Sequence, residues 1–314
     1  MADHLPLSDN NPPAELGTGT PDRAQTLGAR VQANWINAAP DRVPLQQPAR
    51  PGLLHRSGQH SMATLQQGVD FLAFIGQVTV AATAVLRRPA RMRWRAVLHE
   101  VQIGGFDALP IIGLTAFLLG VVVAYQGADQ LRNYGANIFV VELVGYAMLR
   151  EFAPLISAII IAGRSGSAYA AQLGTMVVNE EVDALRTLGI DPLERLVLPK
   201  IMAMAIALPL LTLFADIAGV FGGMVMARSQ LDIGFAEFTD RFGRVMQGSA
   251  LLIGVGKSFV FAFIIVFVGC FQGLRTRGSA DSVGRQTTLS VVQAIFLVIV
   301  ADALFSVAFN ILGL

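Results

Sequence analysis

Four charged residues lie inside long apolar stretches of the sequence, where ionisable side chains are rare. Glu151 opens one such stretch, Lys257 lies well inside another, and Asp302 lies in the middle of a third. Asp216 interrupts a fourth stretch. Charges inside a membrane are costly, so they usually pair with one another or serve transport. We expect Glu151, Lys257 and Asp302 to meet in an intramembrane charge cluster, with Asp216 as a fourth candidate.

This charge cluster has several interpretations. The one we favour is a polar lock that fixes how the helices align. The others are a conformational switch, a contact with a polar lipid head group, and an ion relay through Glu151, Lys257 and Asp302 in a stand-alone secondary transporter or channel. The sequence has no internal repeat, and five spans do not form an even inverted duplication, which weakens the secondary-transporter interpretation.

Catalytic and metal-binding constellations are not evident. The four histidines, His4, His55, His60 and His99, all precede the apolar stretches, and no Ser-His-Asp arrangement or metal site can be recognised. The stretch 251–258 ends like a phosphate-binding loop, but Leu251 stands where that loop needs its first glycine. We therefore expect no enzyme activity, no bound metal or cofactor, and no ATP hydrolysis by this chain alone.

The composition is that of a membrane protein. The chain has 314 residues, 54% of them hydrophobic and 14% charged, with a mean hydropathy of +0.57. A soluble domain usually carries about 25% charged residues. The net charge of +1 gives no sign of a nucleic-acid partner. We expect an all-α integral membrane protein.

Five apolar segments are each close to the length that a helix needs to cross a bilayer. We expect a five-span domain over residues 104–314, with spans at approximately 105–126, 149–171, 201–227, 248–273 and 288–312. Small residues at 162–168 and the G-x-x-x-G spacing at 219–223 indicate close helix packing. Phe117, Tyr125 and Gln126, near one end of the first span, could line a lipid pocket; aromatic residues of the membrane interface are the commoner explanation.

The segment before the spans divides into two parts. Residues 1–60 are rich in proline and lack apolar periodicity, which predicts a disordered extension. Residues 61–103 begin with a modestly apolar helical pattern up to residue 86 and continue into a basic elbow, 87–95, that carries Trp94. We favour a helix lying in the membrane interface over one that spans the bilayer.

A hydrophilic interruption at 172–200 separates the second and third spans. Val182, Leu185 and Leu188 fall on one helical face, with Glu181 and Asp183 off it. Gly189 is a natural C-terminal stop, and Asp191 followed by Pro192 predicts the start of the next helix. The interruption is therefore expected to contain a short amphipathic helix, which is either an ordinary connection or a docking element for a soluble partner.

Lysine and arginine distribution predicts the orientation. The side that holds residues 1–103, 172–200 and 272–287 carries sixteen of these residues, against four on the opposite side. The positive-inside rule places the N-terminus and the 172–200 loop in the cytoplasm and Leu314 on the outer side of the membrane.

Several of these segments together resemble the MlaE permease family of ABC lipid transporters. The resemblance covers about residues 65–314 and rests on several motifs in order: Asn179–Leu185, Gly189–Pro192, Leu196–Pro199, Arg150–Leu155, Ala162–Ala168, Ala215–Asp216, Gly219 and Gly222–Gly223. The 172–200 loop is also similar, more loosely, to the cytoplasmic coupling loop of ABC importers. Residues 1–60 lie outside the family's usual pattern.

The resemblance implies a homodimeric permease in a Gram-negative inner membrane. Two cytoplasmic ATPase subunits would use ATP, and periplasmic MCE-domain proteins would exchange phospholipid or a similar lipid with the permease, which would maintain the asymmetry of the outer membrane. The 172–200 loop would carry an ATPase-coupling helix. Its acidic rim would be Glu180, Glu181 and Asp183, its groove-filling face Val182, Leu185 and Leu188, and its stop Gly189.

Overall fold

The computed structural model describes residues 53–87, 94–246 and 248–312, and within these ranges all regular structure is helical. The contacts divide the chain into two units, Met1–Ala63 and Thr64–Leu314. The second unit carries the bundle described below. Most of the predicted extension, residues 1–52, lies outside the described residues, as do residues 88–93 of the predicted basic elbow.

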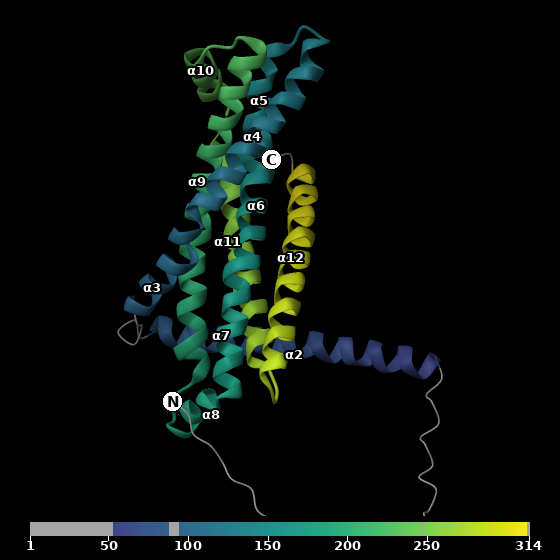
Figure 1. Cartoon of the computed structure of the whole chain (residues 1–314), viewed down its shortest axis with the longest axis vertical. Coiled ribbons are helices and arrows are strands. Elements are labelled where there is room, and N and C mark those ends of the chain that lie inside the picture. The colour runs from purple at the N-terminus through teal and green to yellow at the C-terminus, as the bar shows by residue number, and fades with distance from the viewer. Residues whose placement is uncertain (1–52, 88–93, 247, 313–314) are drawn as a thin grey trace, which may run out of the picture. The chain divides into compact units, whose positions relative to one another are not determined.

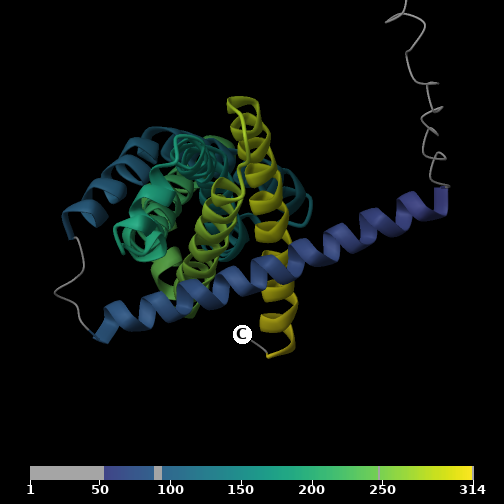
Figure 2. The same cartoon turned by 90° about the horizontal axis from the view of Figure 1, so that it is seen from below.

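The first described helix, α2, spans Leu53–Arg87 and so begins before the predicted start at residue 61. The apolar pattern used to predict it starts only at Met62, and its first turns offer no periodic signal. Phe71 and Phe74 of α2 pack on Phe271 of α11 (Gly248–Leu274), with ring centroids 5.2 and 5.7 Å apart. Past residue 64 the helix crosses the bundle rather than running along it (Figures 1 and 2). This direction suits a helix in the membrane interface, which stays a prediction.

Five long helical stretches make up the bundle. They are α4 (Leu109–Arg132), the interrupted helix from Val140 to Val178, α9 (Leu198–Leu231), α11, and α12 (Ala280–Ile311). Each contains or overlaps one predicted span, and α12 starts eight residues earlier because its first two turns are polar and give no hydropathy signal. With Leu65–Val85 of α2, six helical segments of the described chain are long and apolar enough to cross a membrane.

The second of these stretches is not a regular α-helix. It consists of α5 (Val140–Ala147), a π-helical turn at Met148–Phe152, α6 (Ala153–Ile161), a second π-helical turn at Ala162–Gly166, and α7 (Ser167–Val178). Each π turn adds a residue to the local repeat and so changes which side chains face the neighbours. Glu151 lies in the first turn, which directs it toward α11 and α12.

Helices α4 and α9 pack closely against one another. A fully buried stripe recurs on every fourth residue of α4, at Ile112, Ala116, Gly120 and Ala124. A Cβ atom on Gly120 would overlap the carbonyl oxygen of Gly219, and one on Gly222 would overlap that of Phe117. The glycines let the two backbones touch, as small residues do between membrane helices.

Replacing Gly120 with valine should therefore destabilise the bundle more than most single changes. The added side chain has no room beside the Gly219 backbone, and overpacking of this kind costs about 1–3 kcal/mol or more. Gly163→Val is the matched control, since nothing lies within 4 Å of a Cβ atom there. The melting temperatures of the two variants are measured by thermal unfolding in detergent. Equal melting temperatures would contradict the close packing of α4 on α9.

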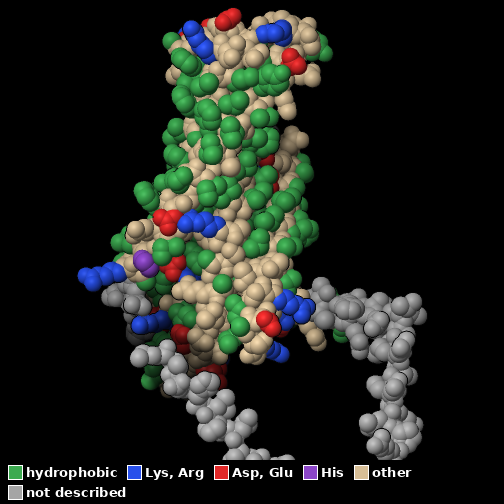
Figure 3. Space-filling view, in the orientation of Figure 1, with side chains coloured by type: hydrophobic (Ala, Val, Ile, Leu, Met, Phe, Trp, Pro, Cys, Tyr) green, Lys and Arg blue, Asp and Glu red, His purple; other side chains and the backbone are tan. Residues whose placement is uncertain are grey.

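The bundle has a distinct structure at each end. The short helix α8 (Glu181–Thr187) lies at one end and α10 (Phe235–Val245) at the other (Figure 1). Phe238 anchors α10 in the core, and Arg241 ties it to Glu142 of α5, with Nε 3.0 Å from Oε1. On the face shown in Figure 3, apolar side chains cover the upper middle, and charged side chains gather at the α10 end and in the lower half.

Candidate functional site

The predicted coupling helix corresponds to α8, between α7 and α9. Glu180, Glu181 and Asp183 are exposed, and Asp183 pairs with Arg186 at 3.0 Å. Leu188, just after the helix, is 73% exposed, whereas Leu185 is half-buried and Val182 is only 3% exposed. Val182 packs inside its own chain, so the structure removes it from the surface that a partner could reach.

The turns that bound α8 depend on two backbone positions. Glu180 has a φ of 61°, which turns the chain sharply between α7 and α8, a backbone role that the sequence did not signal. Gly189 has a φ of 72°, and its N–H donates to the Arg186 carbonyl, so it ends the helix as predicted. Asp191 then accepts a hydrogen bond from the Leu193 N–H at 2.9 Å, which confirms the predicted cap. The loop is therefore built of specific turns.

Three of the four predicted intramembrane charges come together around Lys257 of α11. Its Nζ atom lies 2.7 Å from Glu151 Oε2, 3.1 Å from Asp302 Oδ1 and 3.4 Å from Ser306 Oγ. The Ser306 hydroxyl in turn donates to Glu151 Oε2 at 2.9 Å. The Lys257 side chain is fully buried, that of Asp302 is 13% exposed, and that of Glu151 is about one-third exposed. The cluster joins three membrane helices through one buried cation.

Pro154 helps to form this cluster. A proline has no N–H, so it cannot make the α-helical hydrogen bond to the residue four positions before it. That residue is Arg150, and its carbonyl accepts a hydrogen bond from Lys257 Nζ at 3.0 Å. The motif Arg150-Glu151-Phe152-Ala153-Pro154 thus supplies both a backbone and a side-chain partner for one lysine.

Asp216 is not joined to the cluster by any hydrogen bond found among the described residues. Asp216 lies on α9 and is 4% exposed, and neither of its carboxyl oxygens has a hydrogen-bond partner among the described residues. It lines an apolar cavity beneath α10 instead. Sequence alone places it in a membrane helix but does not give the rotation of that helix.

The predicted lipid-pocket residues do not gather at one place. Phe117 packs against Phe221 of α9 with ring centroids 5.9 Å apart, while Tyr125 and Gln126 are exposed. Phe117 and Gln126 are nine positions apart on one α-helix, a rotation of about 180°. They therefore point to opposite sides of α4 and do not face one another across a cavity of a single chain.

A second buried lysine, Lys200, is not among the predicted site residues. Lys200 Nζ lies 2.6 Å from Glu100 Oε1 of α3 (Trp94–Gly104), 2.7 Å from Gln172 Oε1 of α7, and 4.5 Å from the centre of the Tyr169 ring. Lys200 is the last residue of the 172–200 loop and lies in the first turn of α9, so this network fixes the end of the loop to α3 and α7. The sequence gives little indication of this ion pair, because Glu100 and Lys200 are a hundred positions apart.

Among the described residues, no three His, Cys, Asp or Glu side chains form a group that could hold a metal ion. The arrangement that remains is a membrane bundle with a short exposed helix at one end, a buried charge cluster between three helices, and an apolar cavity near the other end.

Comparison with known proteins identifies the family. Residues 97–308 match the profile of Permease MlaE. The chain belongs to the MlaE permease family. A probable ABC transporter permease protein of Synechocystis sp. is 35% identical over 252 residues, 80% of this chain and 94% of that protein. A probable ABC transporter permease protein of Rickettsia prowazekii is 30% identical over 257 residues, 82% of this chain and 97% of that protein.

A plant relative extends the comparison. The chloroplastic protein TRIGALACTOSYLDIACYLGLYCEROL 1 of Arabidopsis thaliana is 33% identical over 228 residues, 72% of this chain and 65% of that protein. The family match confirms the resemblance drawn from the loop motifs and the all-α membrane fold. This MlaE-family chain is thus a multi-pass membrane protein of the type that serves as the permease component of ABC transporters.

Proposed function

We propose that this chain is the permease subunit of an ABC transporter that moves phospholipid or a similar lipid between the inner membrane and a periplasmic MCE-domain carrier. In this proposal it maintains the lipid asymmetry of the outer membrane. The observation that carries the proposal is α8, a short helix with an exposed acidic rim, followed directly by the exposed Leu188, between two membrane spans of an MlaE-family chain.

The sequence has no nucleotide-binding signature, so ATP-driven transport would need an ATPase outside this chain. A soluble ATPase could receive α8 in a groove, the usual way in which a short amphipathic helix docks. We propose two such ATPase subunits, one for each copy of a homodimeric permease, and ATP is bound by those subunits rather than by this chain.

A lipid substrate is supported by the family and by the name of the Arabidopsis relative, which refers to a galactolipid. The MCE-domain partner rests on the family resemblance alone. The inner-membrane location, with the N-terminus and α8 in the cytoplasm and the C-terminus in the periplasm, rests on the excess of lysine and arginine on the α8 side.

Reconstitution tests the proposal against the alternative of a stand-alone transporter. The chain is placed in vesicles that contain a fluorescent phospholipid, with or without its ATPase subunits, and transfer to an added MCE-domain protein is measured. We expect transfer that requires both ATP and the ATPase. Flux driven by an ion gradient through the chain alone would instead support the alternative, in which Glu151, Lys257 and Asp302 form an ion relay.

A further inference from the structure

A cavity of about 330 Å³ lies between α9, α10, α11 and the first π-helical turn. Nearly all of its wall is apolar: Leu149, Ile217, Val220, Phe221, Met224, Phe238, Phe242 and Leu251. Its volume is at the lower end of the range for small-molecule sites, roughly 300–1,000 Å³. Ile217, Phe221 and Leu251 are exposed at its edge, so a bound molecule could extend out of the cavity along the bundle surface.

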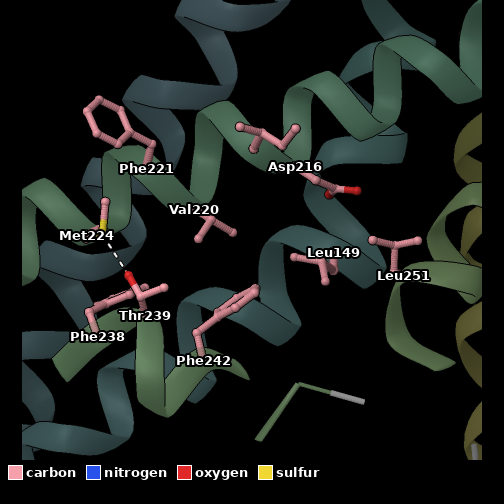
Figure 4. A pocket seen from close by; sticks show the side chains of 10 residues that line it. Leu149, Asp216, Val220, Phe221, Met224, Phe238, Thr239, Phe242 and Leu251 are labelled. Carbon is pink, nitrogen blue, oxygen red and sulfur yellow. Dashed lines mark hydrogen bonds between the residues drawn. The ribbon is translucent and has the colours of Figure 1, made fainter. Parts of the chain in front are cut away.

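The polar side chains of the wall are Asp216 and Thr239. The Thr239 hydroxyl lies 2.8 Å from the Phe235 carbonyl and 3.9 Å from Met224 Sδ, the contact drawn in Figure 4, so its single proton already has acceptors within the chain. Asp216 is more than nine-tenths buried, and both of its carboxyl oxygens lack a partner among the described residues. In Figure 4 its side chain leaves α9 on the side of Leu149 and Leu251.

A buried carboxyl group without a partner is unfavourable, because it loses its hydrogen bonds to water and gains none in return. Native structures rarely leave such a group unsatisfied, and an exception calls for an explanation. A ligand that brings hydrogen-bond donors into the cavity would satisfy both oxygens. The apolar walls at the same time require that the rest of the ligand be hydrocarbon.

We propose that this cavity is a binding site for an amphiphile that carries a primary amine. An ammonium group has three donors and a positive charge, which match a carboxylate with two free oxygens. No lysine, arginine or histidine is among the lining residues, so a carboxylate or a bare phosphate would find no countercharge. The amine can belong to a membrane lipid head group or to a free alkylamine. The site concerns binding by this chain itself and stands apart from the proposed transport.

Photo-crosslinking of the full-length chain in phosphatidylcholine nanodiscs tests the site. Phosphatidylcholine has no N–H donor and therefore does not compete. Three alkyl probes of equal length each carry a diazirine in the chain and end in an amine, an alcohol or a carboxylate. We expect the amine probe to label peptides of residues 217–224 and 235–242 most strongly, as mapped by mass spectrometry. Equal labelling by all three probes would overturn the proposal.

Variants of the cavity sharpen the result. Asp216→Asn keeps the shape and should reduce labelling by the amine about tenfold, the scale of one charge-assisted hydrogen bond, while labelling by the alcohol is unchanged. Leu251→Phe narrows the cavity without touching the carboxyl and should reduce labelling by every probe. Ile206→Phe, on an exposed part of α9 away from the cavity, is the matched control. Amine labelling that survives both cavity variants would overturn the proposal.

Competition identifies the source of the amine. Displacement of the amine probe by phosphatidylethanolamine added to the nanodisc supports a membrane lipid as the occupant. Displacement by a short alkylamine alone supports a free amphiphile. If neither molecule displaces the probe, the labelling is not binding at a defined site and the proposal fails.

Discussion

Replacing Lys257 with methionine should lower the free energy of unfolding by about 3–5 kcal/mol, the cost of removing one partner from a buried ion pair. Methionine fills a similar volume, so packing changes little. It leaves Glu151 and Asp302 near one another without the cation that joins them, and the Arg150 carbonyl loses its Nζ donor. Denaturant titration of the purified chain in detergent, followed by circular dichroism, measures the effect.

Two controls separate the charge cluster from general sensitivity. Arg186→Ala breaks the exposed pair with Asp183 and should cost at most about 1 kcal/mol, since solvent-exposed ion pairs contribute little. Neutralising the whole cluster, with Lys257→Met, Glu151→Gln and Asp302→Asn together, should recover much of the lost stability because no unpaired charge remains. A single Lys257→Met variant as stable as the parent protein would show that the pairs contribute nothing.

The same triple variant distinguishes the interpretations of the cluster. If it folds and still supports ATP-driven lipid transfer, the cluster is a polar lock. If it folds and transfer is lost, the charges take part in the transport cycle. The observed geometry favours the lock, because Lys257 is fully buried and all of its donors have partners within one chain.

The sequence predicts well those features that a single helix determines. Long apolar stretches locate the bundle, Gly189 and Asp191 locate the turns of the loop, and the cost of intramembrane charge brings Glu151, Lys257 and Asp302 into one prediction. The π-helical turns were not predicted, because they depend on contacts with neighbouring helices as much as on local sequence. The same holds for the pairing of Glu100 with Lys200.

The remaining differences between the predicted and the observed site arise from the rotation of each helix about its own axis. Periodicity says which residues share a face, but not what that face contacts. Val182 and Leu188 were therefore grouped together, although Val182 packs on its own chain and Leu188 is exposed. The same limit applies to Asp216. An intramembrane charge is expected to face the bundle interior, but which side chains Asp216 meets there depends on how α9 is rotated about its axis.

Replacing Leu188 with aspartate should abolish most of the functional coupling to the ATPase without affecting the fold. Leu188 is 73% exposed, so the free chain loses little when it becomes polar. In the proposed complex it is an apolar anchor, and loss of such an anchor costs about 2 kcal/mol or more, roughly a thirtyfold weaker association. Co-purification with the ATPase subunits and lipid-dependent ATP hydrolysis measure the two consequences.

Two further aspartate substitutions serve as controls for Leu188→Asp, one at the opposite end of the bundle and one within α8. Tyr134→Asp changes an equally exposed large side chain in the connection between α4 and α5, at the end away from α8, and should leave association with the ATPase unchanged. Leu185→Asp should weaken association and also reduce stability, because Leu185 is half-buried. If Leu188→Asp leaves both association and ATP hydrolysis at the level of the parent protein, α8 is an ordinary connection, and the energy must enter through another part of the chain.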